Sequence, residues 1–253
     1  MRPRSEVATL DTTEHFVEAA LWSAYRLVGM LRTMRTEPAI TTVVFDYGGV
    51  LTTPGRTAVE SWTRAEGIRP ESFSAVLKEW VGHDAPENTP IHRLETGELP
   101  LEEFDRILAE RLRRHDGRPV AAEGLLSRMF SFMQPDEEMM RLVTTLRRSG
   151  RRTGLLSNSW GNSYPWRRLS GMFDHVVVSG EIGMRKPDPR IYRLTLERLE
   201  VAPERALFVD DVRANVATAE ELGMRTILHR DATSTRARLT ELVPDLDNAD
   251  QQE

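Results

Sequence analysis

The chain has 253 residues, a formal net charge of -5 and no cysteine. Charges of both signs are interspersed, which argues against a nucleic-acid-binding surface. The lack of cysteine excludes disulfides, thiolate nucleophiles and thiolate metal sites. No apolar run approaches the roughly 18 residues that a membrane span needs, and the N-terminus does not have the pattern of a secretory signal. We therefore expect a cytoplasmic protein without a nucleic-acid or membrane partner, and the sequence leaves its oligomeric state open.

Residues 1–40 precede the first strand-like run and form an N-terminal leader. Apolar residues recur at helical spacing from Thr13 to Arg35, which predicts one helix in this segment. Two interpretations stay open. Either the helix packs on the outside of the domain, or translation of the native protein begins at Met34.

The first predicted strand is the apolar, β-branched run Thr42–Phe45, and Asp46 follows it directly. The next five residues, Tyr47 to Leu51, include two consecutive glycines and predict a turn. Open α/β sheets bind ligands at the carboxyl ends of their parallel strands. Asp46 therefore occupies a position where catalysis is expected.

A long interval without a strand-like run separates this turn from the next predicted strand. Helical patterns lie near residues 57–66, 71–81, 100–114 and 121–132. A crossover between parallel strands needs only about a dozen residues, so residues 55–133 predict an inserted helical cap. Because the cap is inserted directly after the Asp46 turn, we favour a lid over the site rather than a purely structural bundle.

Strands and helices alternate through the rest of the chain. Further strands are predicted at residues 153–156, 176–178, 206–209 and 226–228, and helices at 136–149, 189–200, 212–222 and 233–242. This alternation predicts an α/β fold, in which a Rossmann-like parallel sheet built from residues 41–54 and 134–242 is covered by helices on both faces. The acidic, polar tail from residue 243 to 253 is expected to be disordered.

Polar residues follow several of the predicted strands. They are Asp46, the pair Ser157–Asn158, Lys186 and the pair Asp210–Asp211. Each group alone is explained as a turn, a solvated loop or a helix cap. Together they converge on one crevice, because the carboxyl ends of parallel strands meet at one edge of a sheet.

The chemistry of these groups fits phosphoryl transfer. Asp46 and Asp211, with Asp210 nearby, offer the oxygen ligands that Mg²⁺ prefers. The Ser157 hydroxyl and the Lys186 ammonium can hold phosphoryl oxygens. Asp46 is then the nucleophile, which forms an aspartyl-phosphate that water hydrolyses. The sequence therefore predicts a Mg²⁺-dependent phosphohydrolase.

Four segments of the chain resemble, in order, the four motifs of the haloacid dehalogenase (HAD) superfamily. They are residues 45–51 (FDYGGVL), 155–160 (LLSNSW), 183–189 (GMRKPDP) and 208–215 (FVDDVRAN). Their spacing most resembles the branch that holds the phosphatase domain of soluble epoxide hydrolase and related phosphatases with a helical cap. The resemblance covers residues 42–242, and the cap matches only in its position and helical character.

The resemblance implies a role for most of the polar residues. Asp46 is implied as nucleophile and metal ligand, and Ser157 as the binder of the phosphoryl group. Lys186 is implied to orient the nucleophile and to balance charge. Asn158 stands beside Ser157 and Lys186 at the substrate, in a supporting position.

The metal site implied by the resemblance includes Asp211, assisted by Asp210, and the backbone carbonyl of Gly48. Asn215 is implied as a support of this site. Position 48 departs from the family pattern, because related phosphatases usually carry there a second aspartate that protonates the leaving group. General acid–base catalysis is worth roughly 10²–10⁴-fold in rate. Anomeric, acyl and aryl phosphates are therefore expected to react better than alkyl phosphates.

Another group can replace the missing acid, and the cap offers His83, His92 and Glu95 as candidates. Arg56, His92, Arg93 and Trp160 are candidate pocket residues, although each fits a surface or packing role as well. The expected substrate is a small phosphorylated metabolite, which no cap motif identifies.

Two alternatives to a phosphatase remain. A catalytically silent HAD-like module that binds a ligand or a partner is favoured by Gly48 and opposed by the intact Asp46, Lys186 and Asp211. A metal-free 2-haloacid dehalogenase is less consistent with the sequence, because carboxylates beside Asp46 would repel an anionic substrate.

Overall fold

A five-stranded parallel sheet forms the centre of the computed structural model, which describes residues 38–82, 85–161 and 164–246. The strands, in the spatial order β3-β2-β1-β4-β5, are β1 (Thr42–Phe45), β2 (Arg152–Ser157), β3 (His175–Val178), β4 (Ala206–Asp210) and β5 (Arg225–Leu228). The predicted α/β fold with a Rossmann-like parallel sheet is thereby confirmed. The expected leader helix and Met34 lie outside the described residues.

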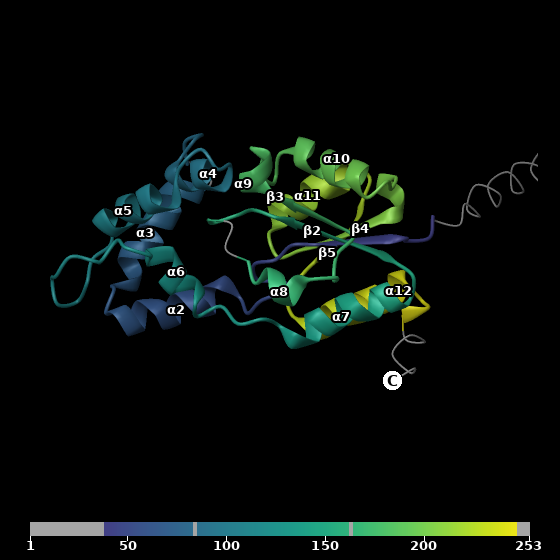
Figure 1. Cartoon of the computed structure of the whole chain (residues 1–253), viewed down its shortest axis with the longest axis horizontal. Helices are drawn as coiled ribbons and strands as arrows, with labels where there is room; N and C mark the ends of the chain where they lie inside the picture. Colours follow the sequence, from purple (N-terminus) through teal and green to yellow (C-terminus); the bar gives the residue numbers. More distant parts are fainter. Residues whose placement is uncertain (1–37, 83–84, 162–163, 247–253) are drawn as a thin grey trace, which may run out of the picture. The chain divides into compact units, whose positions relative to one another are not determined.

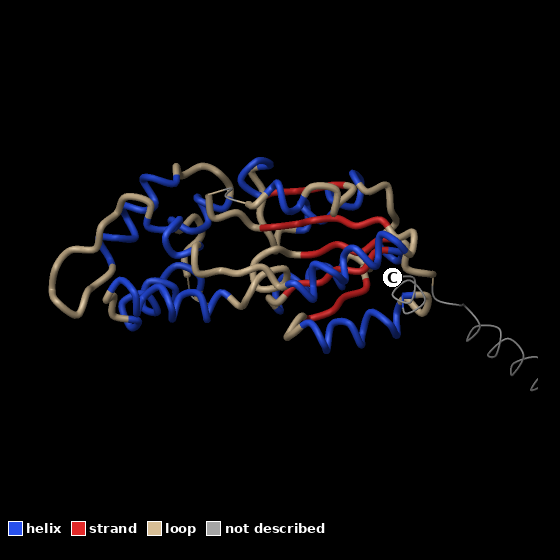
Figure 2. Tube along the Cα trace, turned by 60° about the horizontal axis from the view of Figure 1, so that its bottom comes forward, coloured by secondary structure: helices blue, strands red, loops and turns tan. Residues whose placement is uncertain are grey.

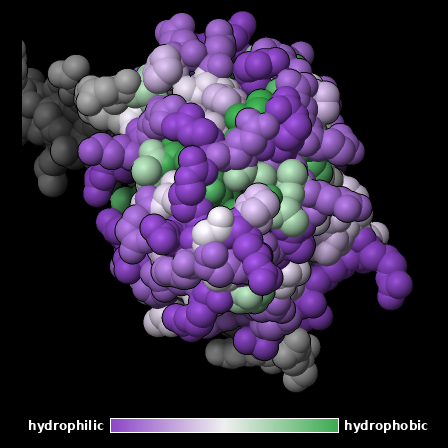
Figure 3. Space-filling model, turned by 90° about the vertical axis from the view of Figure 1, so that its left-hand side faces the viewer, coloured by the Kyte–Doolittle hydropathy of each residue, from purple (hydrophilic) through white to green (hydrophobic). Residues whose placement is uncertain are grey.

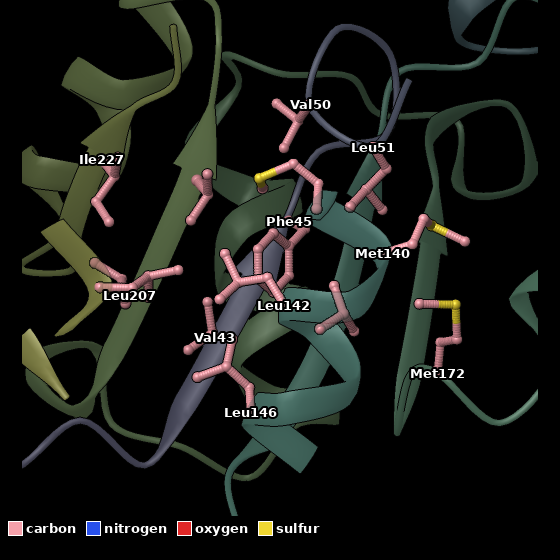
Figure 4. Close-up of a cluster of buried hydrophobic side chains, with 14 of the residues drawn as sticks. Val43, Phe45, Val50, Leu51, Met140, Leu142, Leu146, Met172, Leu207 and Ile227 are labelled. Atoms are coloured by element: carbon pink, nitrogen blue, oxygen red, sulfur yellow. The ribbon is translucent and has the colours of Figure 1, made fainter. Parts of the chain in front are cut away.

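Helices cover both faces of the sheet (Figure 1). The helices α7 (Glu137–Arg148) and α12 (Ala232–Leu242) pack on one face, and α10 (Pro189–Arg198) and α11 (Arg213–Glu221) pack on the other. Side chains of a strand alternate between its faces. Accordingly, Val43 and Phe45 belong to the cluster under α7, where Phe45 lies near Leu142 (Figure 4), and Val44 belongs to the other cluster.

Aspartates directly before three core helices, at their N-cap positions, explain where these helices begin. The Asp136 carboxylate accepts hydrogen bonds from the backbone N–H groups of Glu138 and Met139, both at 3.0 Å. Asp188 caps α10 in the same way, and Asp231 caps α12. Such caps satisfy the free N–H groups of a first helical turn, so each helix begins within one residue of its predicted start.

The cap occupies the interval between β1 and β2 and consists of helices in the described part of the chain. They are α2 (Gly55–Glu66), α3 (Pro70–Val81), α4 (Pro90–Glu95), α5 (Leu101–Arg111) and α6 (Leu125–Phe130). These helices lie beyond the end of the sheet at which β1 leads into the cap (Figures 1 and 2). They bury an apolar cluster of their own around Trp62, Phe104 and Leu125, while the outer face of the cap is mainly hydrophilic (Figure 3).

The sequence patterns did not predict several of the short helices. Besides α4, these are α8 (Trp166–Leu169), α9 (Ser179–Ile182) and the 3₁₀ turn η1 (Pro203–Arg205). Segments of three to six residues span less than two helical turns, which is too short for the 3.6-residue period to be recognised.

The two connections between cap and core run side by side. Thr52 and Pro135 form an antiparallel bridge. The Thr53 N–H donates to the Gln134 carbonyl at 2.7 Å, and the Asp136 N–H donates to the Leu51 carbonyl at 2.9 Å. Both connections of the cap are therefore tied together at one place, directly after the Asp46 turn.

The expectation of a disordered tail from residue 243 is wrong for its first residues. Val243 is 1% exposed and Leu246 is fully buried, and both belong to the cluster under α7 and α12. The physical reason is that two apolar side chains three residues apart close over the end of α12, although the surrounding residues are polar. Residues 247–253 lie outside the described part.

Within the described ranges, none of the helices has the length and apolar composition that a membrane span requires.

Leu246→Ala should therefore lower the free energy of unfolding by about 2–5 kcal/mol, the usual cost of emptying a buried leucine site. Chemical denaturation of both proteins measures the difference. Asp245→Ala is the matched control, because this exposed carboxylate only pairs with Arg151, and it should change stability by less than about 1 kcal/mol. Equal stability of Leu246→Ala and the unmodified protein would mean that the tail frays in solution.

Candidate active site

Asp46 lies at the centre of the sheet edge formed by the strand ends. Its N–H donates to the Val209 carbonyl at 2.9 Å, which extends the pairing of β1 with β4 by one residue. The chain then turns, and the Leu51 N–H donates to the Tyr47 carbonyl at 2.9 Å. The Asp46 side chain is buried but not completely so, at 7% exposure for the residue.

Lys186 reaches into the same place from the loop before α10. Its ammonium donates to Asp46 Oδ1 at 2.7 Å and to Asp210 Oδ2 at 2.6 Å. Both carboxylates are buried, and Lys186 itself is 1% exposed. A buried charge is tolerated when it is paired and hydrogen-bonded, so Lys186 ties the end of β1 to the end of β4.

The protonation states follow from this arrangement. Burial raises the pKa of Asp46 to about 7, although the Lys186 charge opposes the shift and the Asp210 charge adds to it. Burial alone would lower the pKa of Lys186, but the charges of Asp46 and Asp210 outweigh burial and the net pKa is raised. Lys186 therefore remains a cation at neutral pH, while Asp46 is poised to gain or lose its proton there.

Asp211 adds a third carboxylate and completes a group that suits a hard cation. One oxygen each of Asp46, Asp210 and Asp211 lies within 4.8 Å of the other two. Burial raises the pKa of Asp211, and the neighbouring Asp210 charge adds to the shift. An all-oxygen donor set with excess negative charge fits Mg²⁺. The three carboxylates predicted from sequence are thus brought together.

The two glycines of the turn after Asp46 differ in their surroundings. Gly49 has φ +79°, and a Cβ there would lie 2.5 Å from Asp211 Oδ2, so backbone conformation and close approach both require glycine. Gly48 does not have a positive φ, and a Cβ there would meet only the methyl group of Met133, at 3.9 Å. Position 48 therefore has room for a side chain.

Ser157 ends β2, and a tyrosine that the sequence analysis did not single out holds its hydroxyl group. The Tyr164 hydroxyl donates to Ser157 Oγ at 2.9 Å. Burial raises the pKa of Tyr164 to about 12, and the Asp46 charge acts in the same direction. Tyr164 remains a hydrogen-bond donor at neutral pH. No local signal identified it, because it lies seven residues after Ser157 in an irregular loop.

The two asparagines of the motifs act as braces. Asn158 accepts from the Lys186 N–H at 2.8 Å and donates to the Lys186 carbonyl at 3.0 Å. Asn215 donates to both oxygens of Asp210 at 3.1 Å. Asn158 therefore fixes the backbone that carries the Lys186 side chain, and Asn215 fixes one of its two carboxylate partners.

Glu95 is a cap residue that contacts two loops of the core. Its carboxylate accepts from Arg185 Nε at 2.5 Å and from Trp160 Nε1 at 2.9 Å. Both oxygens thus act as acceptors, which argues against Glu95 as the missing proton donor. Trp160 packs against the apolar cluster of the cap.

The other cap candidates are placed differently. Burial lowers the pKa of His92, and the Arg185 charge adds to this, so its ring is neutral at pH 7. Arg56 is exposed on α2 and pairs with Glu60 at 2.8 Å. These contacts fit the surface role and not the pocket role. Arg93 is partly buried on α4. His83 lies outside the described residues.

Comparison with known proteins finds one family model and several relatives that match this chain. The family model of the haloacid dehalogenase-like hydrolases matches residues 40–223. Bifunctional epoxide hydrolase 2 of Sus scrofa is 31% identical over 81% of this chain, and the chain spans 39% of that protein's length. A phosphatase of Mycobacterium tuberculosis is 30% identical over 78% of this chain and 91% of its own length.

A solved structure shares the fold. It is a HAD family enzyme from Bacteroides thetaiotaomicron in complex with magnesium and inorganic phosphate, with a TM-score of 0.56 and 22% identity, and the match covers 76% of this chain and 95% of that chain. At this identity the likeness concerns the fold.

The raised pKa of Asp46 predicts a pH-dependent effect of Asp46→Asn on stability. Between pH about 4 and pH about 7, and without metal, Asp46 is protonated in the folded protein. The same carboxyl group is ionised in the unfolded chain, where its pKa is 3.8. The stabilising contribution of that proton is complete below pH about 4 and is lost as the pH rises through about 7. Asparagine does not titrate, so Asp46→Asn should melt at a higher temperature than the unmodified protein in EDTA, and the gain should grow from pH 5 to pH 8.

Asp116→Asn is the control for this experiment. The Asp116 carboxylate is exposed, and the Arg118 N–H lowers its pKa, so its replacement should give no gain at pH 8. Thermal melts in EDTA across this pH range measure both variants. A gain for Asp46→Asn that does not change with pH would contradict the assigned pKa.

Proposed function

The chain belongs to the haloacid dehalogenase-like hydrolases, and from this premise we propose that it is a Mg²⁺-dependent phosphohydrolase of a small phosphorylated metabolite. The observation that carries the proposal is the Lys186 ammonium between the Asp46 and Asp210 carboxylates. This pairing holds Asp46 at the edge of the sheet where the strands end. Asp211 adds further negative charge there, which can hold a cation.

Asp46 is the proposed nucleophile. One of its oxygens attacks the phosphorus atom, the bond from phosphorus to the ester oxygen breaks, and the leaving group departs with the bonding electrons. Water then attacks the aspartyl-phosphate and releases inorganic phosphate, which regenerates the carboxylate. Bound Mg²⁺, held by Asp46, the Gly48 carbonyl and Asp211 with Asp210 beside them, would offset the repulsion between the carboxylates and the anionic substrate.

Ser157 and Lys186 are the proposed binders of the phosphoryl oxygens. Tyr164 donates to an acceptor position of the Ser157 hydroxyl. The single proton of that hydroxyl makes only a long bond of 3.5 Å, to the Asn158 carbonyl, so it can turn to a phosphoryl oxygen instead. Asn158 keeps Lys186 in position through two backbone hydrogen bonds. These groups neutralise and orient the transferred group, which is the main demand of phosphoryl transfer.

The cluster of the three carboxylates also helps to distinguish the phosphatase from the two alternatives. A 2-haloacid is itself an anion, and three carboxylates with one ammonium repel it unless a cation is added. This opposes a metal-free dehalogenase. A silent module that binds a phosphorylated ligand is consistent with Gly48, and it differs from the phosphatase in having no turnover.

Asp46→Asn should lower turnover of p-nitrophenyl phosphate by more than about a thousand-fold, because the amide cannot act as a nucleophile. EDTA should abolish the activity of the unmodified protein, and added Mg²⁺ should restore it. Asp211→Asn should require a higher Mg²⁺ concentration for half-maximal rate. Steady-state release of p-nitrophenol measures all three. Undiminished turnover in Asp46→Asn would exclude the covalent mechanism, and full activity in EDTA would exclude the metal.

The chemistry at position 48 predicts a dependence on the leaving group. Without an aspartate at this position, rates should fall steeply as the pKa of the leaving group rises, so that aryl and acyl phosphates react faster than primary alkyl phosphates. Gly48→Asp should then raise the rate on alkyl phosphates by up to about 10²-fold, toward the lower end of general acid catalysis. A Cβ at position 48 would meet only Met133, at 3.9 Å, and φ there is not positive, so the backbone does not oppose the substitution.

Gly48→Ala is the matched control, because it fills the same space without a carboxyl group and should bring no gain. Gly49→Ala should lose activity, since its Cβ would meet Asp211. Rates are measured across a leaving-group series at fixed pH and saturating Mg²⁺. A flat series, with formation of the phosphoenzyme limiting the rate, would mean that another residue supplies the proton. No turnover of any phosphate would favour the silent module.

A further inference from the structure

Glu95 is a buried carboxylate of the cap whose partners all belong to the core. It is the last residue of α4, and it is 6% exposed. Its carboxylate accepts from Arg185 Nε at 2.5 Å and from Trp160 Nε1 at 2.9 Å, and the Asn158 amide lies at the long distance of 3.5 Å. A carboxylate that leaves water must find such partners, and here the cap alone does not supply them.

The partners of Glu95 are neighbours of the proposed catalytic residues. Arg185 directly precedes Lys186, and Asn158 directly follows Ser157. Asn158 also holds both backbone groups of Lys186. The contacts of this one cap side chain therefore reach both loops that would hold the phosphoryl group.

The backbone at Glu95 makes a second connection that does not depend on its side chain. Ser179 Oγ donates to the Glu95 carbonyl at 2.5 Å and accepts from the Ser159 N–H at 2.8 Å. Two residues after Glu95, a Cβ at Gly97 would lie 2.4 Å from the Gly180 carbonyl oxygen. The end of α4 thus lies directly against α9, with the loop after β2 bound to the same hydroxyl.

Trp160 joins the loop after β2 to the interior of the cap. Its ring centroid lies 6.4 Å from those of Phe104 and Phe130, which belong to α5 and α6. Its indole N–H is the group that Glu95 binds. Movement of the cap away from the core would therefore break an ion pair, remove the partner of a partly buried indole N–H and expose an aromatic contact together.

We propose that Glu95 is a positioning residue, through which docking of the cap orders the loops that carry Ser157, Asn158 and Lys186. The proposal rests on the proposed function, because it assigns these loops to phosphoryl binding. With the cap docked, Glu95 fixes Arg185 and Trp160, and the phosphoryl-binding groups take their places. With the cap released, both loops lose these contacts. Closure over the substrate and assembly of the site are then one event.

Glu95→Gln tests the role of the charge, because glutamine keeps the size of the side chain and can still accept from Trp160. Glu66→Gln is the matched control. Glu66 pairs with Arg128 Nε at 2.6 Å in another ion pair, of which both residues are partly exposed and both belong to the cap. A merely structural ion pair would affect stability alike in both variants and would leave the core loops unchanged.

Hydrogen exchange followed by mass spectrometry measures the loops without requiring turnover. We expect faster exchange in Glu95→Gln for the amides of Ser159 and Lys186, which are bound by Ser179 and Asn158. Exchange at these amides should be unchanged in Glu66→Gln. Unchanged exchange in Glu95→Gln, or equal acceleration in both variants, would overturn the proposal.

Kinetics provide the second measurement. With p-nitrophenyl phosphate and saturating Mg²⁺, Glu95→Gln should lower kcat by up to about a hundred-fold, the effect expected when positioning is lost, while Glu66→Gln keeps the rate of the unmodified protein. A change confined to KM would overturn the proposed effect on assembly of the site. If the unmodified protein hydrolyses no phosphate, the proposed function fails, and the exchange measurement still decides whether Glu95 orders these loops.

Discussion

The contact on which the rest of the site depends is the Lys186 ammonium shared by two buried carboxylates. Asp46 and Asp210 stand at the ends of adjacent strands, where their charges repel each other in a poorly hydrated place. Lys186 makes this juxtaposition possible, since its bonds of 2.7 and 2.6 Å offset part of that repulsion. The remaining excess of negative charge, increased by Asp211, is what suits the edge of the sheet to a divalent cation.

Residues around this contact restrict how it can move. Asn215 holds Asp210 by both oxygens, and Asn158 holds the backbone of Lys186 on both sides of its Cα. Because the site is built from four separate loops, an error in the position of one would be transmitted to the pairing of charges. The cap touches two of these loops, those of Asn158 and Lys186, through Glu95, so its position and the geometry of the charged site are physically linked.

The two glycines after Asp46 illustrate how similar residues serve different constraints. Gly49 is required by its left-handed backbone and by the Asp211 carboxylate at the position where a Cβ would lie. Neither constraint applies to Gly48. Neither the backbone conformation nor the surrounding atoms therefore require glycine at position 48.

Local sequence patterns were sufficient to predict the fold and the members of the charged site. Unbroken apolar runs identify parallel strands, and polar residues at their ends meet because such strands share one edge, so Asp46, Lys186, Asp210 and Asp211 were predicted from local patterns. Tertiary structure alone decided which partners each group has. Tyr164 carries no local signal, and the motif that contains Arg185 does not indicate its partner. Their roles arise from contacts with Ser157 and with Glu95, the latter 90 residues away from Arg185 in the chain. Burial of Val243 and Leu246 was likewise decided by packing, because composition reports average polarity and not the direction in which two apolar side chains point.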